Sequence, residues 1–371
     1  MSEGLSERDA LLILNGLRYV GPVLLKRLLS AYSGSAVSVL SSSRKDLLNV
    51  DGVGPKAADA LLHWAEHFDL QREKKRLSEG SIHFVDCHAD AYPGLLRHTY
   101  DPPIGLYWNG EYTIARPCVA IIGTRRATLY GLRMARQLAG GLARLGFCIV
   151  SGLARGVDTA AHQAALESGG PTIAVLGCGL DIIYPPENLE LYQKIVAAGA
   201  VISEFPFGRR ADRQTFPMRN RIIAGLSQGV VVVESAQSGG SMITARFAGE
   251  QGKCIMALPG RVDQSSSGGC HQLIRDGATL VTGIEDVLDE LGYHSIALEN
   301  INEQSETTPT VQLGVEEKAL MDAFRGGGVY TVDALSIVTG MAVASVLVHL
   351  MALELKGLIA KRSDGCFEAR V

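Results

Sequence analysis

Between residues 113 and 294, short apolar runs alternate with segments that carry helix signals, and this alternation constrains the fold more than any other feature. The apolar runs lie at 118–122, 148–151, 172–176, 200–203, 230–234 and 254–258, and the helix signals at 131–145, 158–168, 187–197, 244–252 and 284–291. The run Val230 to Val233 is unbroken, as in strands that are buried on both faces of a parallel sheet. The sequence therefore predicts an α/β fold with a doubly wound, mostly parallel sheet.

Glycine-containing turns follow the predicted strands. They are Gly123-Thr124-Arg125-Arg126, the segment 151–156 with Gly152 and Arg155, the segment 177–179, Ser238-Gly239-Gly240-Ser241, and 259–260. In an open α/β sheet such turns gather along one edge, where ligands bind. Glycine lets the backbone approach a ligand closely, and the helix predicted from Met242 would turn its N-terminal N–H groups toward an anion. The first turn lacks the GxGxxG spacing, so no dinucleotide cofactor is expected.

The arginines indicate which anion is expected. The net charge of the chain is −4, but between Glu111 and Asp158 there are seven arginines and no Asp, Glu or Lys. Arg219 and Arg221 flank Asn220, and guanidinium forks match phosphate. Because single-stranded nucleic acid needs a charged groove and flat side chains for base stacking, Phe216 is the candidate for stacking.

Most of these cations are expected to converge on the binding edge. The predicted nucleic-acid contacts are Gly123, Thr124, Arg125, Arg126, Gly152, Arg155, Phe216, Arg219, Asn220, Arg221, Ser238, Gly239, Gly240, Ser241 and Lys253. Two alternatives stay open. Phe216 is equally suited to anchor a turn from the core, and Arg126 or Arg219 to form a structural ion pair with Glu204 or Glu234.

The segments on either side of the sheet predict further parts. Residues 1–80 are expected to form short helices, with Gly-Pro turns before 23–29 and 56–67. The second turn, GVGPKAADAL, resembles a helix-hairpin-helix, a motif that grips phosphate through glycine N–H groups, although a helical packing module fits equally well. Residues 81–112 are expected to pack as an extension on the central domain, 113–294. Residues 295–313 are polar and acidic, and we expect a linker there.

The C-terminal segment 314–371 has the order of a winged helix: helices at 316–324, 331–339 and 343–355, then a hairpin at 358–361 and 366–370. The third helix carries mostly apolar residues, whereas a helix that recognises DNA bases needs basic and amide side chains. We therefore favour a protein-contact or dimer role for this domain.

Composition excludes several classes of protein. The seven cysteines form no CxxC pair, so neither a disulfide framework nor a zinc site is expected, and His83, His88 and His98 lack the spacing of metal ligands. No apolar run has the length of a membrane span, and the polar N-terminus lacks a signal peptide. The sequence thus predicts a cytoplasmic protein without metal, cofactor or membrane contact.

The motifs AIIGTRRATLYG, SGLARGVDTAAHQAAL, AVLGCGLDIIYPPENLEL, SEFP, FPMRNRIIAGLS, SGGSMITARFA and PGRVDQSSSGGCHQLIRDGA follow one another along the chain. In this order they resemble the DNA-processing protein A (DprA/Smf) family. The resemblance implies a Rossmann-like domain with an N-terminal module of SAM or helix-hairpin-helix type and a C-terminal winged helix. It also implies a homodimer through the Rossmann-like domain. The implied function is a single-stranded-DNA-binding recombination mediator that protects incoming DNA during natural transformation and helps to load the RecA recombinase, without catalysis.

An enzyme is the alternative. The loop SGGSMITAR also resembles that of nucleotide phosphoribohydrolases, which bind phosphate with a PGGxGTxxE loop and use its Glu in catalysis. Arg246 occupies the place of that Glu, and a cation cannot serve as the base or nucleophile. Asp158 and His162, four residues apart on one helix, are candidates for an acid/base pair, but capping of N–H groups is the commoner role of an Asp at a helix start. No catalytic residue is therefore predicted.

Overall fold

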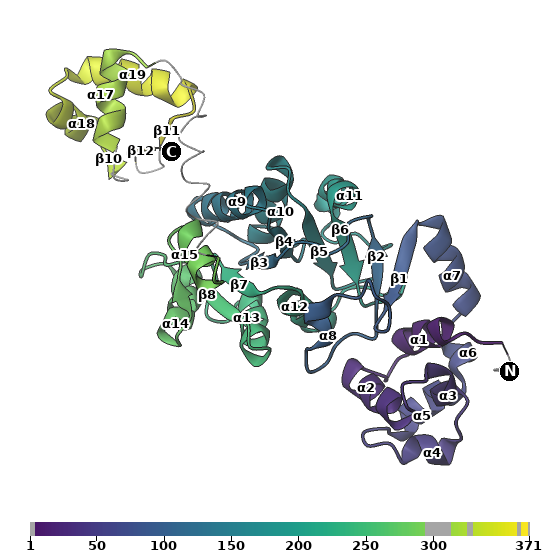
Figure 1. Ribbon diagram of the computed structural model, residues 1–371. Helices are drawn as coiled ribbons and strands as arrows, with labels where there is room; N and C mark the ends of the chain where they lie inside the picture. Colours follow the sequence, from purple (N-terminus) through teal and green to yellow (C-terminus); the bar gives the residue numbers. More distant parts are fainter. Residues whose placement is uncertain (1–3, 294–312, 325–328, 362–364, 370–371) are drawn as a thin grey trace. The chain divides into compact units, whose positions relative to one another are not determined.

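The computed structural model describes residues 4–293, 313–324, 329–361 and 365–369 (Figure 1). They belong to two compact units, Met1–Asn300 and Ile301–Val371. The linker expected at 295–313 lies outside the described residues except for Leu313.

The N-terminal module is helical, as predicted. Its helices are α1 (Glu7–Gly16), α2 (Pro22–Ala31), α3 (Ala36–Leu40), α4 (Arg44–Leu48), α5 (Pro55–Leu62), α6 (Trp64–His67) and α7 (Leu70–Glu79). Helices α2 and α5 each begin with proline after a glycine N-cap, because proline lacks the N–H that would have no partner at that position. Tyr107 of the sheet donates a hydrogen bond of 2.7 Å to Glu73 of α7, which fastens the module to the sheet.

The first compact unit contains a nine-stranded sheet in the order β1-β2-β6-β5-β4-β3-β7-β8-β9. Its strands are β1 (Ile82–Asp86), β2 (Gly105–Asn109), β3 (Cys118–Ile122), β4 (Cys148–Ser151), β5 (Thr172–Leu176), β6 (Ala200–Ser203), β7 (Gly229–Val232), β8 (Cys254–Ala257) and β9 (Thr279–Leu280). Strands β3 to β9 are parallel, whereas β1 and β2 join antiparallel at one edge. The extension expected at 81–112 therefore supplies two strands to the sheet itself.

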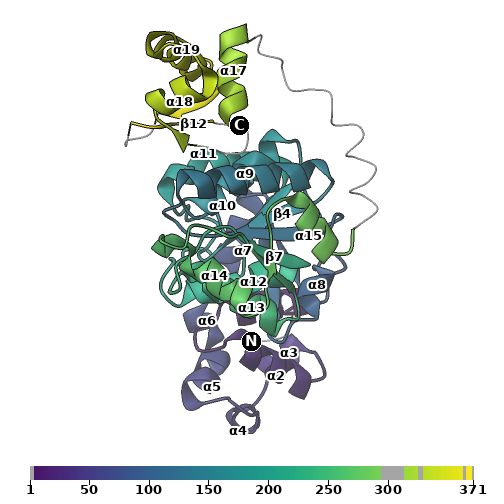
Figure 2. The ribbon, with the colours of Figure 1, turned by 90° about the vertical axis from the view of Figure 1, so that its left-hand side faces the viewer.

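Helices cover both faces of the sheet, which confirms the doubly wound prediction (Figures 1 and 2). They are α8 (Gly94–Arg97), α9 (Leu129–Arg144), α10 (Val157–Glu167), η1 (Pro186–Asn188), α11 (Leu189–Ala198), α12 (Thr215–Leu226), α13 (Gly240–Glu250), η2 (Ser265–Ser267), α14 (Gly268–Arg275) and α15 (Ile284–Glu290). In β7, Val230 and Val232 pack in the core under α12 and α13, while Val231 packs under α9 and α10. This alternation explains why the strand needs apolar residues at every position.

The strand order places a topological switch point beside β3. From β3 the chain winds outward through β4 and β5 to β6, and it then returns to β7 on the other side of β3. The loops after β3 and β7 consequently lead in opposite directions and leave a crevice at the carboxyl ends of these strands. Helix α12, which the sequence pattern did not indicate, makes the return crossing, and its first turn lies at that crevice.

The second compact unit is a winged helix. It consists of α17 (Val315–Phe324), β10 (Val329–Tyr330), α18 (Val332–Thr339), α19 (Val343–Leu355), β11 (Ile359–Lys361) and β12 (Phe367–Ala369), with the strand order β10-β12-β11. Its own core includes Leu320, Leu335 and Leu350. The helices and hairpin agree with the prediction, and β10 is an addition to it.

No single helix in the described parts of the chain combines the length and apolar character of a membrane span. Helices α18 and α19 reach these values only when taken together, and the chain bends by 107° between them.

Candidate nucleic-acid interface

A cleft of about 440 Å³ occupies the switch point. Its walls come from the loop after β3, the loop after β4, the first turns of α12 and the N-terminus of α13. Three arginines and one aspartate line it: Arg125, Arg126, Arg219 and Asp158. The cleft therefore has an excess of positive charge at the position where the sequence analysis expected an anion site.

The loop after β3 is held across the end of β7. The N–H of Thr124 donates to the carbonyl of Glu234 at 2.7 Å, and a side chain at Gly123 would collide with that carbonyl and with Val157. This anchoring leaves Arg125 and Arg126 exposed at the cleft. Because this backbone hydrogen bond fixes the loop, the backbone positions from which the Arg125 and Arg126 side chains extend are also fixed.

Arg125 and Phe216 form the most informative pair in the cleft. The Arg125 guanidinium carbon lies 4.8 Å from the centre of the Phe216 ring, and the ring is half-buried at the start of α12. A guanidinium on an aromatic face presents a charge and a flat surface together, which suits a phosphate and its base. Phe216 therefore lines the cleft and is not a residue of the buried core.

Arg219 lines the cleft but is largely buried, with 5% of its surface exposed. Its Nη1 donates to the carbonyls of Gly152, at 2.5 Å, and Val175, and its Nε donates to Asn220 at 3.1 Å. Burial lowers the pKa of Arg219, and the nearby Asp158 carboxylate opposes this effect. Arg219 thus joins the loop after β4 to the end of β5 and adds a positive charge at the floor of the cleft. It does not form the alternative ion pair with Glu204 or Glu234.

Asp158 closes the loop after β4. Its carboxylate accepts hydrogen bonds from the N–H groups of Gly152 at 3.1 Å and Ala154 at 3.4 Å. Burial raises the pKa of Asp158, while Arg219 and these N–H groups hold it down. Asp158 therefore binds backbone N–H groups, as its position near a helix start suggested, but they belong to the preceding loop, and no side chain caps α10 at its N-cap Gly156.

The loop after β7 ends in helix α13, which begins at Gly240, two residues earlier than predicted. Gly239 is its N-cap and no side chain caps it. A side chain at Gly239 would lie 2.9 Å from the carbonyl of Ala236, whereas one at Gly240 would meet nothing within 4 Å. Gly239 therefore serves the packing of the loop, and Gly240 keeps the helix end open toward the cleft.

Several predicted contacts do not line the cleft. Arg221 points away, because its guanidinium is buried against Glu204 at 2.5 Å and Asp101 at 3.4 Å. Lys253 precedes β8 and so lies at the amino ends of the parallel strands, whereas the cleft lies at their carboxyl ends. Of the six cations, Arg125, Arg126 and Arg219 line the cleft, Arg155 lies in the loop after β4 beside it, and Arg221 and Lys253 do not reach it.

The other predicted positions lie close to the cleft without lining it. Arg155 is exposed and paired with Glu187. Gly152 packs against the guanidinium of Arg219, where a side chain would collide with it. Ser238 is exposed in the loop after β7. The remaining predicted residues that do line the cleft are Gly123, Thr124, Asn220, Gly239, Gly240 and Ser241.

Tyr184 is a residue that the sequence analysis missed. Its ring centre lies 6.0 Å from that of Phe216, at an interplanar angle of 50°. It lies in the loop after β5, directly before two prolines. The only signal for it in the sequence is an aromatic residue in a loop that follows a strand.

Comparison with known proteins identifies the family of the chain. Residues 83–292 match the family described as DNA recombination-mediator protein A, and residues 304–365 match the DprA winged helix domain. The chain is 32% identical to Protein Smf of Synechocystis sp., over 98% of this chain and 99% of that protein. The chain belongs to the DprA family.

Other DprA proteins support this assignment. DNA processing protein DprA of Streptococcus pneumoniae is 44% identical over 55% of this chain and 72% of its own length. The X-ray structure of DprA from that organism matches with a TM-score of 0.63 at 34% identity, covering 78% of this chain and 94% of that one. A Helicobacter pylori DprA structure, which concerns single-stranded DNA binding, matches with a TM-score of 0.51 at 33% identity over 58% of this chain and 97% of that one.

In this DprA-family chain the residues considered for the enzyme alternative do not form a catalytic pair. His162 is fully buried, and its Nδ1 lies 2.7 Å from the hydroxyl of Thr172, whereas Asp158 bonds to backbone N–H groups. Arg246 is exposed on α13 and pairs with Glu250 at 3.5 Å. Asp158, His162 and Arg246 therefore do not form an acid/base pair in this cleft.

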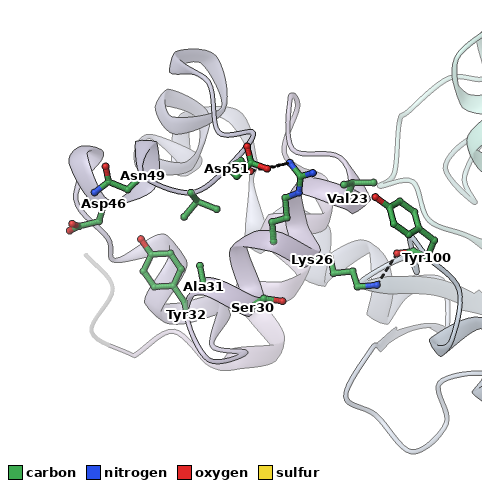
Figure 3. Close-up of a pocket in the computed structure, with 11 residues that line it drawn as sticks. Val23, Lys26, Ser30, Ala31, Tyr32, Asp46, Asn49, Asp51 and Tyr100 are labelled. Carbon is green, nitrogen blue, oxygen red and sulfur yellow. Dashed lines mark hydrogen bonds and ion pairs between the residues drawn. The ribbon is translucent and has the colours of Figure 1, made fainter.

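A larger cavity, of about 790 Å³, lies at the N-terminal module, where it is lined by residues of α2, by residues 46–51 and by Tyr100 (Figure 3). Its two cations are already engaged: Lys26 donates to the carbonyl of Tyr100 at 2.8 Å, and Arg27 pairs with Asp51 at 2.8 Å. The cleft at the switch point is therefore the stronger candidate for a polyanion.

Proposed function

We propose that the protein is a single-stranded-DNA-binding recombination mediator that protects incoming DNA during natural transformation. The observation that carries the proposal is the Arg125–Phe216 pair beside the open end of α13, at the topological switch point. Membership of the DprA family and the single-stranded DNA binding described for the Helicobacter pylori protein support it.

The finer parts of the role rest on the family. As a mediator the protein would hand the single strand to RecA and act as a homodimer through the Rossmann-like domain, in the cytoplasm, without catalysis. The exposed apolar residues of α19, among them Val348, Met351 and Leu355, support a protein-contact role for the winged helix.

The binding test is a titration of fluorescent oligo-dT and a matched duplex at several salt concentrations. We expect the protein to prefer the single strand, with log affinity falling by about 0.7 per phosphate neutralised as log salt rises. Phe216→Ala should weaken binding by roughly 1–3 kcal/mol, the value of one stacked base. Arg125→Ala should weaken binding to all sequences alike and reduce the salt slope by about 0.7.

Arg116→Ala is the matched control. Arg116 is exposed just before β3, at the opposite end of the strand from Arg125, so its removal deletes the same charge away from the cleft. Equal losses for Arg116→Ala and Arg125→Ala would contradict the assignment of the cleft. Release of a base from AMP by the purified protein would instead support the hydrolase.

A further inference from the structure

We propose that the single strand leaves the cleft across Phe216 and Tyr184 and continues into a second hollow, where Tyr184 stacks a base and Arg210 binds a phosphate. This inference rests on the proposed function and gives the strand a direction on the surface. It adds two contact residues that lie outside the cleft.

Tyr184 continues the aromatic surface of the cleft. With Phe216 it forms a tilted pair, and 42% of Tyr184 is exposed. Arg125 also lies against Phe216, 4.8 Å from the centre of its ring. Arg125 and Phe216 line the cleft and Tyr184 does not, so the contacts of Phe216 lead from the cleft to its outside. A groove for a single strand needs such successive flat side chains, because each base offers a face for stacking.

Tyr184 also belongs to the wall of a second hollow, of about 500 Å³. Its lining residues are Asp181, Ile182, Tyr184, Gly208, Arg210 and Ala211. One tyrosine therefore borders this hollow and touches the phenylalanine that lines the cleft. The two depressions are neighbours along a single path.

The charge of this hollow favours a phosphate. Asp181 is its single carboxylate among the lining residues; it is neutralised by Arg76 at 3.1 Å and accepts a hydrogen bond of 2.9 Å from the N–H of Gly208. Arg210 is exposed, and within the described parts of the chain it has no hydrogen-bond or ion-pair partner. Its neighbour Arg209, by contrast, is paired with Asp212 at 2.6 Å. An unpaired guanidinium beside a neutralised carboxylate gives the hollow a net positive charge.

The sequence around Arg210 explains its freedom. The segment Gly208-Arg209-Arg210 forms an exposed turn before α12, and Gly208 has a φ of 80°, which favours glycine. Asp181 and Asp212 hold the turn through Gly208 and Arg209. Gly208 and Arg209 therefore make the contacts that fix this segment, and the Arg210 side chain takes no part in them.

The test measures the affinity of the full chain for oligo-dT of increasing length, from about four to about 16 nucleotides. The variant Tyr184→Ala/Arg210→Ala should bind the shortest oligonucleotides as the unchanged protein does. It should lose affinity for the longer ones, roughly five- to 150-fold for the lost stacked base alone, with a salt slope lower by about 0.7. Tyr184→Phe with Arg210 intact keeps the ring and the charge and should restore long-oligonucleotide binding.

The control is Tyr100→Ala/Arg116→Ala, which removes the same two residue types elsewhere. Tyr100 is 74% exposed beside the N-terminal module, and Arg116 lies before β3, at the opposite end of this strand from Arg125. The control should bind every length like the unchanged protein. Arg210→Ala alone, in an exposed turn, provides a variant that should not disturb folding, and it should show the reduced salt slope.

Three results would overturn the inference. They are full affinity of the double variant at every length, an equal loss at every length, and an equal loss in the control. In each case the proposed function stands if the unchanged protein still prefers the single strand and Arg125→Ala still weakens binding. A protein that binds no single strand at all would overturn the proposed function itself.

Discussion

Arg219 and Arg221 show how two neighbouring residues of the same type acquire different roles. The sequence places both beside Asn220, and the helix α12 then turns them about 200° apart, since each residue adds about 100°. Arg219 reaches the floor of the cleft, and Arg221 reaches Glu204 and Asp101 in the interior. The position of an arginine in a sequence motif therefore does not predict its partner until the direction in which the helix turns its side chain is known.

Breaking the buried ion pair should destabilise the protein. Arg221→Met leaves the Glu204 carboxylate, whose pKa is already raised by burial, without its partner. We expect the free energy of unfolding to fall by about 3–5 kcal/mol in denaturant titrations. Arg246→Ala breaks an exposed pair and should cost only about 0.2–1 kcal/mol. Equal costs for the two variants would contradict the structural role of Arg221.

His162 should remain neutral in mildly acidic solution. Burial lowers its pKa from 6.5 to about 3. The hydroxyl of Thr172 donates to the carbonyl of Ile149, so it accepts from Nδ1–H of His162, and a proton on Nε2 would have no acceptor. Since the unfolded chain binds this proton below about pH 6.5 and the folded chain does not, His162 contributes stability above that pH. This contribution falls by about 1.4 kcal/mol per pH unit down to about 3.

The measurement is the ¹⁵N chemical shift of the His162 ring at pH 5, which should be that of a neutral imidazole. Protonation of the ring near pH 6 would show that the site is more open than the contacts indicate.

At the scale of elements, the helix termini and strand ends form the cleft. The N-termini of α12 and α13 meet the loops after β3 and β4, because all of them lie at the carboxyl ends of parallel strands. Lys253 does not line the cleft for the same reason: it precedes its strand and therefore lies at the amino ends of the strands. The polarity of each strand decides which end of it reaches the ligand.

The two glycines at the start of α13 should respond differently to the same substitution. Gly239→Ala would bring a methyl group to 2.9 Å from the carbonyl of Ala236 and should cost about 1–3 kcal/mol of stability. Gly240→Ala meets open space and should leave stability unchanged or raise it by up to about 1 kcal/mol. It should nevertheless weaken oligo-dT binding, because the methyl group covers the end of the helix. Full binding by Gly240→Ala would show that the DNA backbone does not approach this point.

At the scale of the molecule, the two compact units have separate cores, and the whole cleft lies in the first. A chain that ends after Tyr293 should therefore fold and bind oligo-dT with unchanged affinity. Thermal unfolding and fluorescence titration beside the full chain check the two expectations. A lower affinity with intact folding would show that the winged helix contributes to DNA binding, contrary to the protein-contact role proposed for it.

Much of the fold and half of the cation set could be predicted from local pattern. Apolar runs such as Val230 to Val233 specify strands buried on both faces, and Gly-Pro turns specify the starts of α2 and α5. Arg125 and Arg126 were found because residues directly after a strand must lie at its carboxyl end. Helix α12 was missed because the apolar residues of FPMRNRIIAGL show no amphipathic period: from Arg219 to Leu226 every residue is buried.

The sequence alone determined the alternation of β3 to β8 with most of their helices, the separate winged helix and the arginine-bearing turns, because these follow from local periodicity and turn chemistry. Only the tertiary structure decided that Arg221 meets Glu204 and that Tyr184 touches Phe216. These contacts join residues from different elements, and the strand order and the rotation of each helix set them. No short stretch of sequence carries that information.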